Sequence, residues 1–467
     1  MILLTLNIIR KLVNNMYKSS IIGFFLVSSL IFGSGNMMIL QGAAAQDYYN
    51  DDIQYMDSSS SGYRDDNNDN NYYNNNNYYP PKDSDNNNKK KYVCKDGPFE
   101  GLLTSSVEFC KPSITVPTDF PTIQAAINAS NPGDTIKVLP GIYTEQIIIS
   151  KSLTIIGSGA KSTIIQAPDV LNPSPVIPFP GRANIVDIFN EAIVTMKGFT
   201  IAGPSGNICE GLAGVSIQED ATLEIDSSAI IGCLREGIQV GLSEFIPIGP
   251  NVGHAVITNT DITDYRVVGI QTGGENTTLV VSKSQVIAAD ALEGEDQIGI
   301  FGGIGPKVVI VDNKISGNIC KTPECVPDLS PQVPHSGIFL LDVNQDSIID
   351  GNKVTNNDVG IAVAGNSGCC KIENNKLSDN LFFGVIVVDG EHTISNTKIF
   401  GGNVGVAAIA FSANTIATLD HVKIVGATIP VQEFPSGGFT AEVVILPNSF
   451  QNSKDGKPYF DSEEVLY

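Results

Sequence analysis

Charged side chains recur at one position of the sequence, directly before glycines that each open an apolar stretch. The glycines are Gly237, Gly269, Gly299, Gly337 and Gly360, and the charged residues before them are Arg235, Glu236, Arg266, Asp296, His335 and Asp358. Mixed charges and a lone histidine on one edge can form an acid–base site, and carboxylates there can also hold calcium. We therefore name Arg266, Asp296 and His335 as candidate catalytic residues, and Arg235, Glu236 and Asp358 as candidate substrate-binding residues. The alternative is a solvated edge of a repeat protein, which carries such charges without any site.

An acidic stretch before Gly299 is a candidate calcium site. It contains Asp290, Glu293 and Glu295 beside Asp296. These residues lack the Asp-x-Asp-x-Asp-Gly spacing of a calcium-binding loop, so an acidic surface loop is the alternative. The sequence predicts no cofactor other than this calcium ion.

An internal repeat must position these residues. The segments "VVIVDNKISGN", "SIIDGNKVTNNDVGIAV", "CKIENNKLSDNLFFGVIVV" and "HTISNTKIFGGNVGVAAI" share one pattern, and lysines recur in it at 314, 353, 376, 398 and 423. Their separations of 39, 23, 22 and 25 indicate coils of 22 to 25 residues with one long insertion. Short β runs at this period predict an all-β solenoid of about ten coils, a parallel β-helix.

Stacked coils place like residues in ladders, because neighbouring strands lie about 4.8 Å apart. Asn318, Asn357 and Asn380 are predicted to form such a ladder. Leucine-rich repeats share the apolar-x-x-Asn cadence, but they need dense leucine and a helical return. Residues 121–129 carry apolar side chains at helical spacing, and we expect this helix, capped by Asp119, to cover the first coil.

Eight cysteines in a chain with a leader-like start indicate disulfides. Six of them are assigned to disulfides: Cys94, Cys110, Cys209, Cys233, Cys320 and Cys325. Cys209 and Cys233 occupy the same turn of successive coils, so a bridge between them would join neighbours. The vicinal pair Cys369-Cys370 has no assigned role, and no Cys-x-x-Cys spacing indicates a metal site.

The segment from Thr122 to Ile165, with "TIQAAI", "PGDTIKVLPGIYTE" and "SLTIIGSG", resembles the N-terminal part of right-handed parallel β-helix proteins of the pectin lyase-like superfamily. It is similar to pectinesterases and to β-helix proteins associated with periplasmic copper processing. The resemblance implies the fold over residues 115–445, but its members include esterases, hydrolases, lyases, epimerases and inert proteins.

The enzyme motifs of that superfamily are incomplete in this chain. A lone Gln345-Asp346 stands where pectinesterases carry three motifs, and the chain has no tryptophan. Residues 259–261 read Asn-Thr-Asp, which resembles a polygalacturonase motif. They occupy the repeat slot that later reads Asn396-Thr397-Lys398, so a ladder role is favoured.

Residues 1–45 are predicted to be a secretory signal peptide that is cut after Ala45. A retained membrane anchor is the alternative, because Ile21 to Leu40 approaches the length of a spanning helix. Residues 46–91 are rich in Asn, Asp and Tyr, and we expect a disordered spacer. Residues 92–467 are predicted to form the β-helix domain.

The chain has a formal net charge of −22, which disfavours nucleic acid as a partner and would repel polyanionic sugars unless cations intervene. We expect a secreted or cell-surface monomer without a membrane span once the signal is cut, with polysaccharide or cell-envelope partners. The first hypothesis is a glycan-binding or structural scaffold. The second is a polysaccharide lyase, epimerase or hydrolase that uses Arg266, Asp296 and His335.

Overall fold

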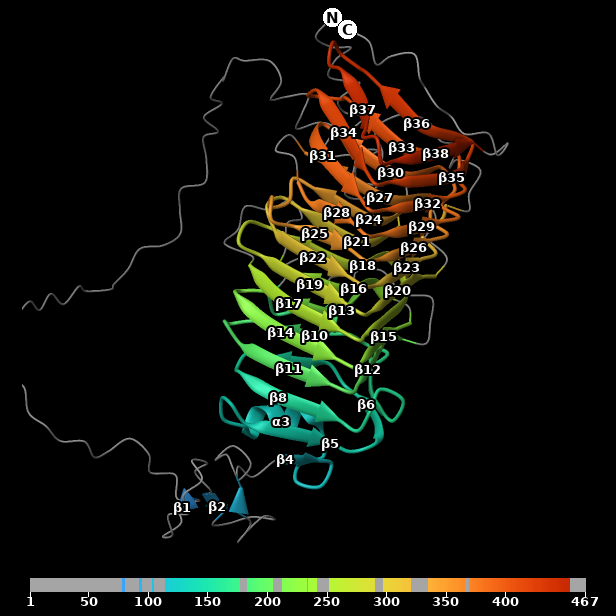
Figure 1. Cartoon of the computed structure of the whole chain (residues 1–467). Coiled ribbons are helices and arrows are strands. Elements are labelled where there is room, and N and C mark those ends of the chain that lie inside the picture. Colours follow the sequence, from blue (N-terminus) through green and yellow to red (C-terminus); the bar gives the residue numbers. More distant parts are fainter. Residues whose placement is uncertain are drawn as a thin grey trace, which may run out of the picture. The chain divides into compact units, whose positions relative to one another are not determined.

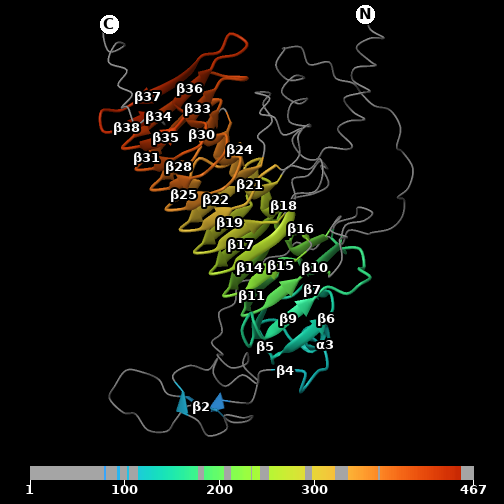
Figure 2. The same cartoon turned by 90° about the vertical axis from the view of Figure 1, so that its right-hand side faces the viewer.

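The computed structural model describes residues 114–176, 183–204, 212–232, 234–241, 252–289, 297–320, 335–365 and 369–453, with short strands at 78–79, 92–94 and 103–104. The strands from residue 114 onward form stacked coils, seen in two views in Figure 1 and Figure 2. A separate compact unit, Leu30–Pro112, contains an antiparallel sheet of β1 (Tyr78–Tyr79), β2 (Tyr92–Cys94) and β3 (Leu103–Thr104). Among the described residues, no helix has the length and apolarity needed to cross a membrane.

One long parallel sheet forms the first face of the solenoid. It contains thirteen strands, where the sequence predicts about ten coils. They are β4 (Ile114–Val116), β5 (Thr135–Val138), β8 (Leu153–Gly157), β11 (Ile193–Lys197), β14 (Ala221–Asp226), β17 (Gly253–Thr258), β19 (Thr278–Ser282), β22 (Lys307–Val311), β25 (Ile348–Asp350), β28 (Lys371–Glu373), β31 (Gly390–Ser395), β34 (Thr415–Asp420) and β37 (Ala441–Ile445).

The other two faces form a second parallel sheet of 22 strands. One face has mostly short strands: β6 (Gly141–Thr144), β9 (Thr163–Gln166), β12 (Thr200–Ala202), β15 (Ala229–Ile231), β20 (Gln285–Ala288), β23 (Lys314–Ser316), β26 (Lys353–Thr355), β29 (Lys376–Ser378), β32 (Lys398–Phe400), β35 (Lys423–Ala427) and β38 (Phe450–Ser453). The other face has β7 (Ile147–Ile149), β10 (Ala183–Ile188), β13 (Leu212–Ile217), β16 (Leu234–Val240), β21 (Ile298–Gly303), β24 (Ser336–Leu341), β27 (Val359–Ala364), β30 (Phe383–Val388), β33 (Val404–Ile409) and β36 (Ile429–Phe434). Strand β18 (Asp261–Gly273) contributes to both faces. The predicted all-β parallel solenoid is confirmed.

Inward-facing Ile and Val side chains fill the solenoid. On the six-residue strands, Ile300 lies opposite Ile338, and Ile361 lies opposite Val385, with each of these side chains fully buried. Residues that alternate with them point outward. Because each coil contacts only its neighbours, stability grows by adding such ladders rather than by enlarging one core.

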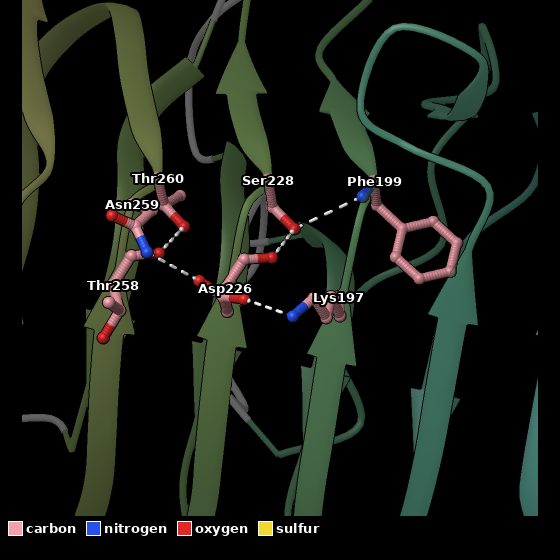
Figure 3. A network of polar contacts seen from close by, with 7 residues as sticks. All are labelled: Lys197, Phe199, Asp226, Ser228, Thr258, Asn259 and Thr260. Carbon is pink, nitrogen blue, oxygen red and sulfur yellow. Dashed lines mark hydrogen bonds and ion pairs between the residues drawn. The ribbon is translucent and has the colours of Figure 1, made fainter.

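The corner between the long sheet and the short strands is built from polar ladders. Figure 3 shows an early corner, where Lys197 Nζ lies 2.8 Å from Asp226 and Asn259 donates to Asp226 at 3.0 Å. Thr260, the next residue, is fully buried, and its hydroxyl donates a hydrogen bond to the Thr258 carbonyl. It therefore has a structural role in the turn. The Asn-Thr-Asp motif at 259–261 is therefore a corner of the fold, as its repeat slot indicates.

Two asparagine ladders form the corners on either side of the short strands in later coils, and the first lies between the short strands and the six-residue strands. Asn318 Nδ2 donates to Asn357 Oδ1 at 2.8 Å, and Asn357 Nδ2 donates to Asn380 Oδ1 at 3.0 Å, which confirms the predicted ladder. A second ladder, formed by Asn313, Asn352 and Asn375, continues the corner of Figure 3 between the long sheet and the short strands. Their amides satisfy buried backbone groups that the turns leave without strand partners.

The helix over the first coil is α3 (Ile123–Ala129), and it buries Ile123 and Ala126 against the solenoid. Its cap differs from the prediction, because Thr122 rather than Asp119 accepts the Ala125 backbone N–H. Asp119 instead accepts from the Thr115 backbone N–H, since it lies in the turn that precedes the helix.

Glu145, the last residue of the "GIYTE" stretch, binds the N-terminus of the covering helix. Its carboxylate accepts the backbone N–H groups of Ile123 and Gln124, at 3.0 and 2.9 Å, at the N-terminus of α3. A carboxylate at this position satisfies free N–H groups and interacts favourably with the helix dipole. The stretch fixes the covering helix to the second coil.

We expect Glu145→Ala to lower the free energy of unfolding by about 2 kcal/mol, because two charge-assisted hydrogen bonds at a helix N-terminus are lost. Thermal unfolding of this variant and of Glu224→Ala, an exposed glutamate on β14, checks the expectation. Equal melting temperatures for the two variants would contradict it.

Candidate functional site

The structure places four of the strands that carry the charged residues near the strand glycines in the order β16, β18, β24 and β27, with Arg266 within β18 and with His335 and Asp358 directly before β24 and β27. Arg235 and Glu236 lie on β16, where Arg235 Nε is 3.3 Å from Glu236 Oε1 and Glu236 is fully buried. Arg266 lies on β18, and its backbone carbonyl accepts from the Gln297 side chain. His335 is two ladder steps farther, so the Cα atoms of Arg266 and His335 are about 10 Å apart.

His335 and Asp358 are brought together on adjacent coils. The Asp358 backbone N–H donates to the His335 carbonyl at 3.2 Å, and Asp358 Oδ2 accepts from the Cys320 backbone N–H at 2.9 Å. Both side chains are buried, with exposed fractions of 5% and 1%. Among the described residues, His335 Nδ1 and Asp358 Oδ1 are buried without hydrogen-bond partners.

Burial reverses the usual order of the two pKa values, so that the pKa of Asp358 lies above that of His335. Desolvation lowers the pKa of His335 to about 4. Desolvation raises the pKa of Asp358 to about 6, although the hydrogen bond from Cys320 opposes the shift. At neutral pH the histidine is therefore neutral and the aspartate is charged, so Asp358 is a buried carboxylate without a counter-charge in the part of the chain that the structure describes.

Substituting Asp358 with asparagine should stabilise the protein at pH 7 and leave it unchanged near pH 4. A raised carboxyl pKa gives stability at low pH that is lost as pH rises through about 6, so the gain reaches about 3 kcal/mol for two pKa units. The asparagine side chain would still accept the hydrogen bond from Cys320.

His335→Gln should stabilise the protein only at low pH. Its gain in unfolding free energy appears as pH falls from about 6.5 toward 4, because the native histidine resists protonation there. Melting temperatures between pH 4 and 8 test both variants, and a gain for Asp358→Asn that is independent of pH would contradict the assignment.

Several predicted residues lie outside the described residues. These are Asp296, the calcium candidates Asp290, Glu293 and Glu295, and the cysteines Cys110, Cys209, Cys233 and Cys325. Cys94 lies on β2, and Cys320 is disulfide-bonded. Within the described ranges, no group of three His, Cys, Asp or Glu side chains is arranged to hold a metal ion.

The outer side of the six-residue strands is not an open surface. Phe301 and Phe339 point outward from it, yet they are only 3% and 5% exposed, and their ring centroids are 5.6 Å apart. Polar side chains on earlier strands of this face are also buried, among them Asp187, whose pKa burial raises. The face that carries the predicted catalytic edge is therefore covered.

An open groove lies instead on the long sheet, over β28 and β31, with a volume of about 430 Å³. Its lining residues are Gln345, Cys369, Cys370, Lys371, Ile372, Glu373, Glu391, Thr393 and Ser395. A disulfide joins Cys369 to Cys370 directly before β28, and both residues are largely buried. The groove thus combines the edge of a largely buried disulfide with carboxylate, hydroxyl and amide groups.

The strand register fixes how the groove residues face one another. Ile372 pairs with Ile394, and Glu373 pairs with Ser395, so Lys371 lies opposite Thr393 on the outer face. Beneath the disulfide, His392 points inward and its Nε2 lies 2.9 Å from the Asp389 carbonyl. Burial lowers the pKa of His392, so the ring is neutral and belongs to the interior.

Sequence reasoning did not identify this groove. The vicinal cysteines and Gln345 were visible signals, but neither was assigned a role. Glu391 and Thr393 lie one coil later, and only the strand register shows that they face residues 369–373.

The sequence matches the protein family described as a right handed beta helix region, over residues 184–376 and 248–429. These matches together cover residues 184–429, more than half of the 467 residues. No curated protein sequence matches the chain significantly.

Several solved structures are similar to this chain. The catalytic domain of a GH87 alpha-1,3-glucanase in complex with tetrasaccharides has 13% identity and a TM-score of 0.47, and the match covers 72% of this chain and 68% of that one. The Dettilon tailspike protein has 15% identity and a TM-score of 0.39, with coverage of 72% and 70%. The A-module of the Azotobacter vinelandii mannuronan C-5 epimerase AlgE6 has 13% identity and a TM-score of 0.34, with coverage of 70% and 93%.

Proposed function

We propose that this chain, which belongs to the right-handed β-helix family, is a glycan-binding scaffold that holds a neutral polysaccharide in the groove over β28 and β31. The observation that carries the proposal is the lining of the groove. Glu391 and Thr393 are exposed on β31 and share the outer face with Lys371 on β28. Carboxylates accept hydrogen bonds from sugar hydroxyls, and threonine can both donate and accept.

The Cys369–Cys370 disulfide lines the groove beside the polar groups of two coils. Both cysteines are more than nine-tenths buried and belong to the hydrophobic core, so the polar side chains of the groove carry the expected contacts with sugar hydroxyls.

We also place the protein outside the cell, as a secreted or surface-attached monomer. This part of the proposal rests on the leader-like residues 1–45 and on the low-complexity residues 46–91. N-terminal sequencing of protein collected from culture medium tests it, with a mature start at Gln46 as the expected result.

Affinity gel electrophoresis of the purified full chain tests glycan binding. The gels contain dextran, soluble β-glucan or galactomannan, with and without EDTA to test the calcium expectation. We expect at least one polysaccharide to retard the protein, and Glu391→Gln to weaken that retardation about tenfold, because a hydrogen bond to a charged group is lost. Glu224→Gln, a change at an exposed glutamate of the same sheet, should have no effect. Retardation that is absent in all gels, or equal for the two variants, would contradict the proposal.

A second candidate function is a polysaccharide-processing enzyme that acts at His335 and Asp358. It is favoured by the two buried side-chain atoms on adjacent coils that have no partner among the described residues, and by the opposite pKa shifts of the two residues. Assays for new reducing ends and for unsaturated sugars, run on the same polysaccharides and on polygalacturonate, test it. Product release that is abolished by His335→Gln would establish this function in place of the scaffold.

A further inference from the structure

Five lysines form a single exposed row along the face of short strands. The register pairs each with the next: Lys314 with Lys353, Lys353 with Lys376, Lys376 with Lys398, and Lys398 with Lys423. All five are exposed, on β23, β26, β29, β32 and β35. The strand spacing of about 4.8 Å places five positive charges in a line parallel to the solenoid axis. We call this set the lysine row.

The charges of the lysine row are not neutralised within the described protein. None of the five is in an ion pair with another described residue. The nearest contact is between Lys376 Nζ and the Phe400 ring, 5.8 Å from its centroid. Like charges directly opposite on neighbouring strands destabilise a sheet, so the row carries a cost in stability that a ligand could offset.

Carboxylates lie near the row, but among the described residues none forms an ion pair with its lysines. Asp350 accepts a hydrogen bond from Asn374 at 2.7 Å, and Asp420 lies 2.6 Å from the ring of His421. Glu373 and Asp312 lie on the same side, and Asp379 lies beyond the other side of the row. Lysine stems are long and raise their ammonium groups above such shorter side chains.

We propose that the lysine row binds a linear acidic polysaccharide, with one acidic group for each coil. The row is straight and periodic, as is a polysaccharide that carries one carboxylate or sulfate on each monomer. Hydroxyl side chains run beside the row at Ser316, Thr355 and Ser378, where they can contact sugar hydroxyls. This site is separate from the groove over β28 and β31, and its ligand is acidic where the ligand of the groove is neutral.

Nucleic acid fits the row less well. Proteins that bind single strands combine basic grooves with aromatic side chains on which bases stack, but the row is accompanied by small hydroxyl side chains in its first three coils. The net charge of −22 repels long polyanions of both kinds away from this one strip, so it does not separate the two ligands.

Equilibrium binding of the full chain to polygalacturonate and to dextran sulfate tests the proposal, with neutral dextran and oligo(dT) as comparison probes. In the triple variant Lys353→Gln, Lys376→Gln and Lys398→Gln, we expect acidic polysaccharide binding to weaken by at least about tenfold. The slope of log Kd against log salt should fall by about two, the value for three lost contacts at roughly 0.7 each. The corresponding triple change to arginine should retain binding, because it keeps the charges.

A control variant separates the row from the total charge. The changes Lys161→Gln, Lys283→Gln and Lys307→Gln remove the same charge from dispersed, exposed positions. We expect this control to bind as the unmodified protein does. The row variant should melt at the same or a higher temperature, since like-charge repulsion is relieved. Equal losses in both triple variants, salt-independent binding, or tighter binding of oligo(dT) than of polygalacturonate would overturn the proposal.

Discussion

Replacing Asn352 with alanine is expected to lower the free energy of unfolding by about 3 to 5 kcal/mol. Asn352 Oδ1 accepts from the backbone and side-chain N–H groups of Asn313 at 3.0 and 3.1 Å. Its Nδ2 donates to the Ile310 carbonyl at 2.8 Å and to Asn375 at 3.1 Å. The substitution removes all four hydrogen bonds at a buried corner and leaves their partner groups unsatisfied. A buried polar group without a partner costs more free energy than a single hydrogen bond contributes.

The effect of this substitution should extend beyond one coil. Asn352 joins the coil before it to the coil after it, and a solenoid is held together by interfaces between neighbours. Asn403→Ala is a matched control, because Asn403 is exposed and no hydrogen bond of its side chain is found within the described residues. Thermal unfolding followed by far-UV circular dichroism measures both. A loss for Asn352→Ala as small as that for Asn403→Ala would show that the ladder does not stabilise the corner.

Replacing Gly360 with alanine should be at least as damaging, with an expected loss of about 3 kcal/mol or more. A Cβ atom at Gly360 would lie 2.5 Å from the Gly384 carbonyl oxygen and 2.8 Å from both the Asn380 side-chain nitrogen and a Leu377 methyl group. The nearest atom belongs to the backbone of the next coil, which cannot move without separating the strands. Glycine is required here because the coils stack backbone against backbone.

The contrast is Gly401→Ala. Gly401 has a φ of +71° and nothing within 4 Å of its ideal Cβ position, so alanine meets only backbone strain of about 1 to 2 kcal/mol. Melting temperatures and the yield of folded protein compare the two variants. If Gly360→Ala were tolerated as well as Gly401→Ala, close packing of Gly360 against the backbone of the next coil would not explain why glycine stands there.

The stacking of coils follows from the sequence because strand registers repeat the same residue types. Lys314 pairs with Lys353 despite the 39-residue interval, so the long insertion leaves the ladder intact, as the repeat predicted. The alignment on glycines likewise placed His335 and Asp358 on adjacent coils. The hydrophobic pattern and the repeat spacing are sufficient to predict these features, because each coil contacts only its neighbours.

Burial and the groove depend on contacts that the sequence does not reveal. Both interpretations of His335 and Asp358, a binding site or a solvated edge, placed them at an open surface, but they are buried, which decides their pKa values. The groove combines Gln345, from the turn before β25, with residues of two later strands. The helix cap was assigned to Asp119 rather than Thr122 because several polar residues precede α3, and only geometry selects one.

Carboxyl labelling tests the central claim, glycan binding in the groove, most directly. The full chain is treated with a carbodiimide and an amine, with and without the neutral polysaccharide that retards it on gels, and the modified residues are read by mass spectrometry. The account predicts that bound polysaccharide slows labelling of Glu373 and Glu391, while labelling of Glu224 on the same sheet is unchanged. Unchanged labelling of Glu373 and Glu391 in the presence of bound polysaccharide would contradict the groove as the binding site.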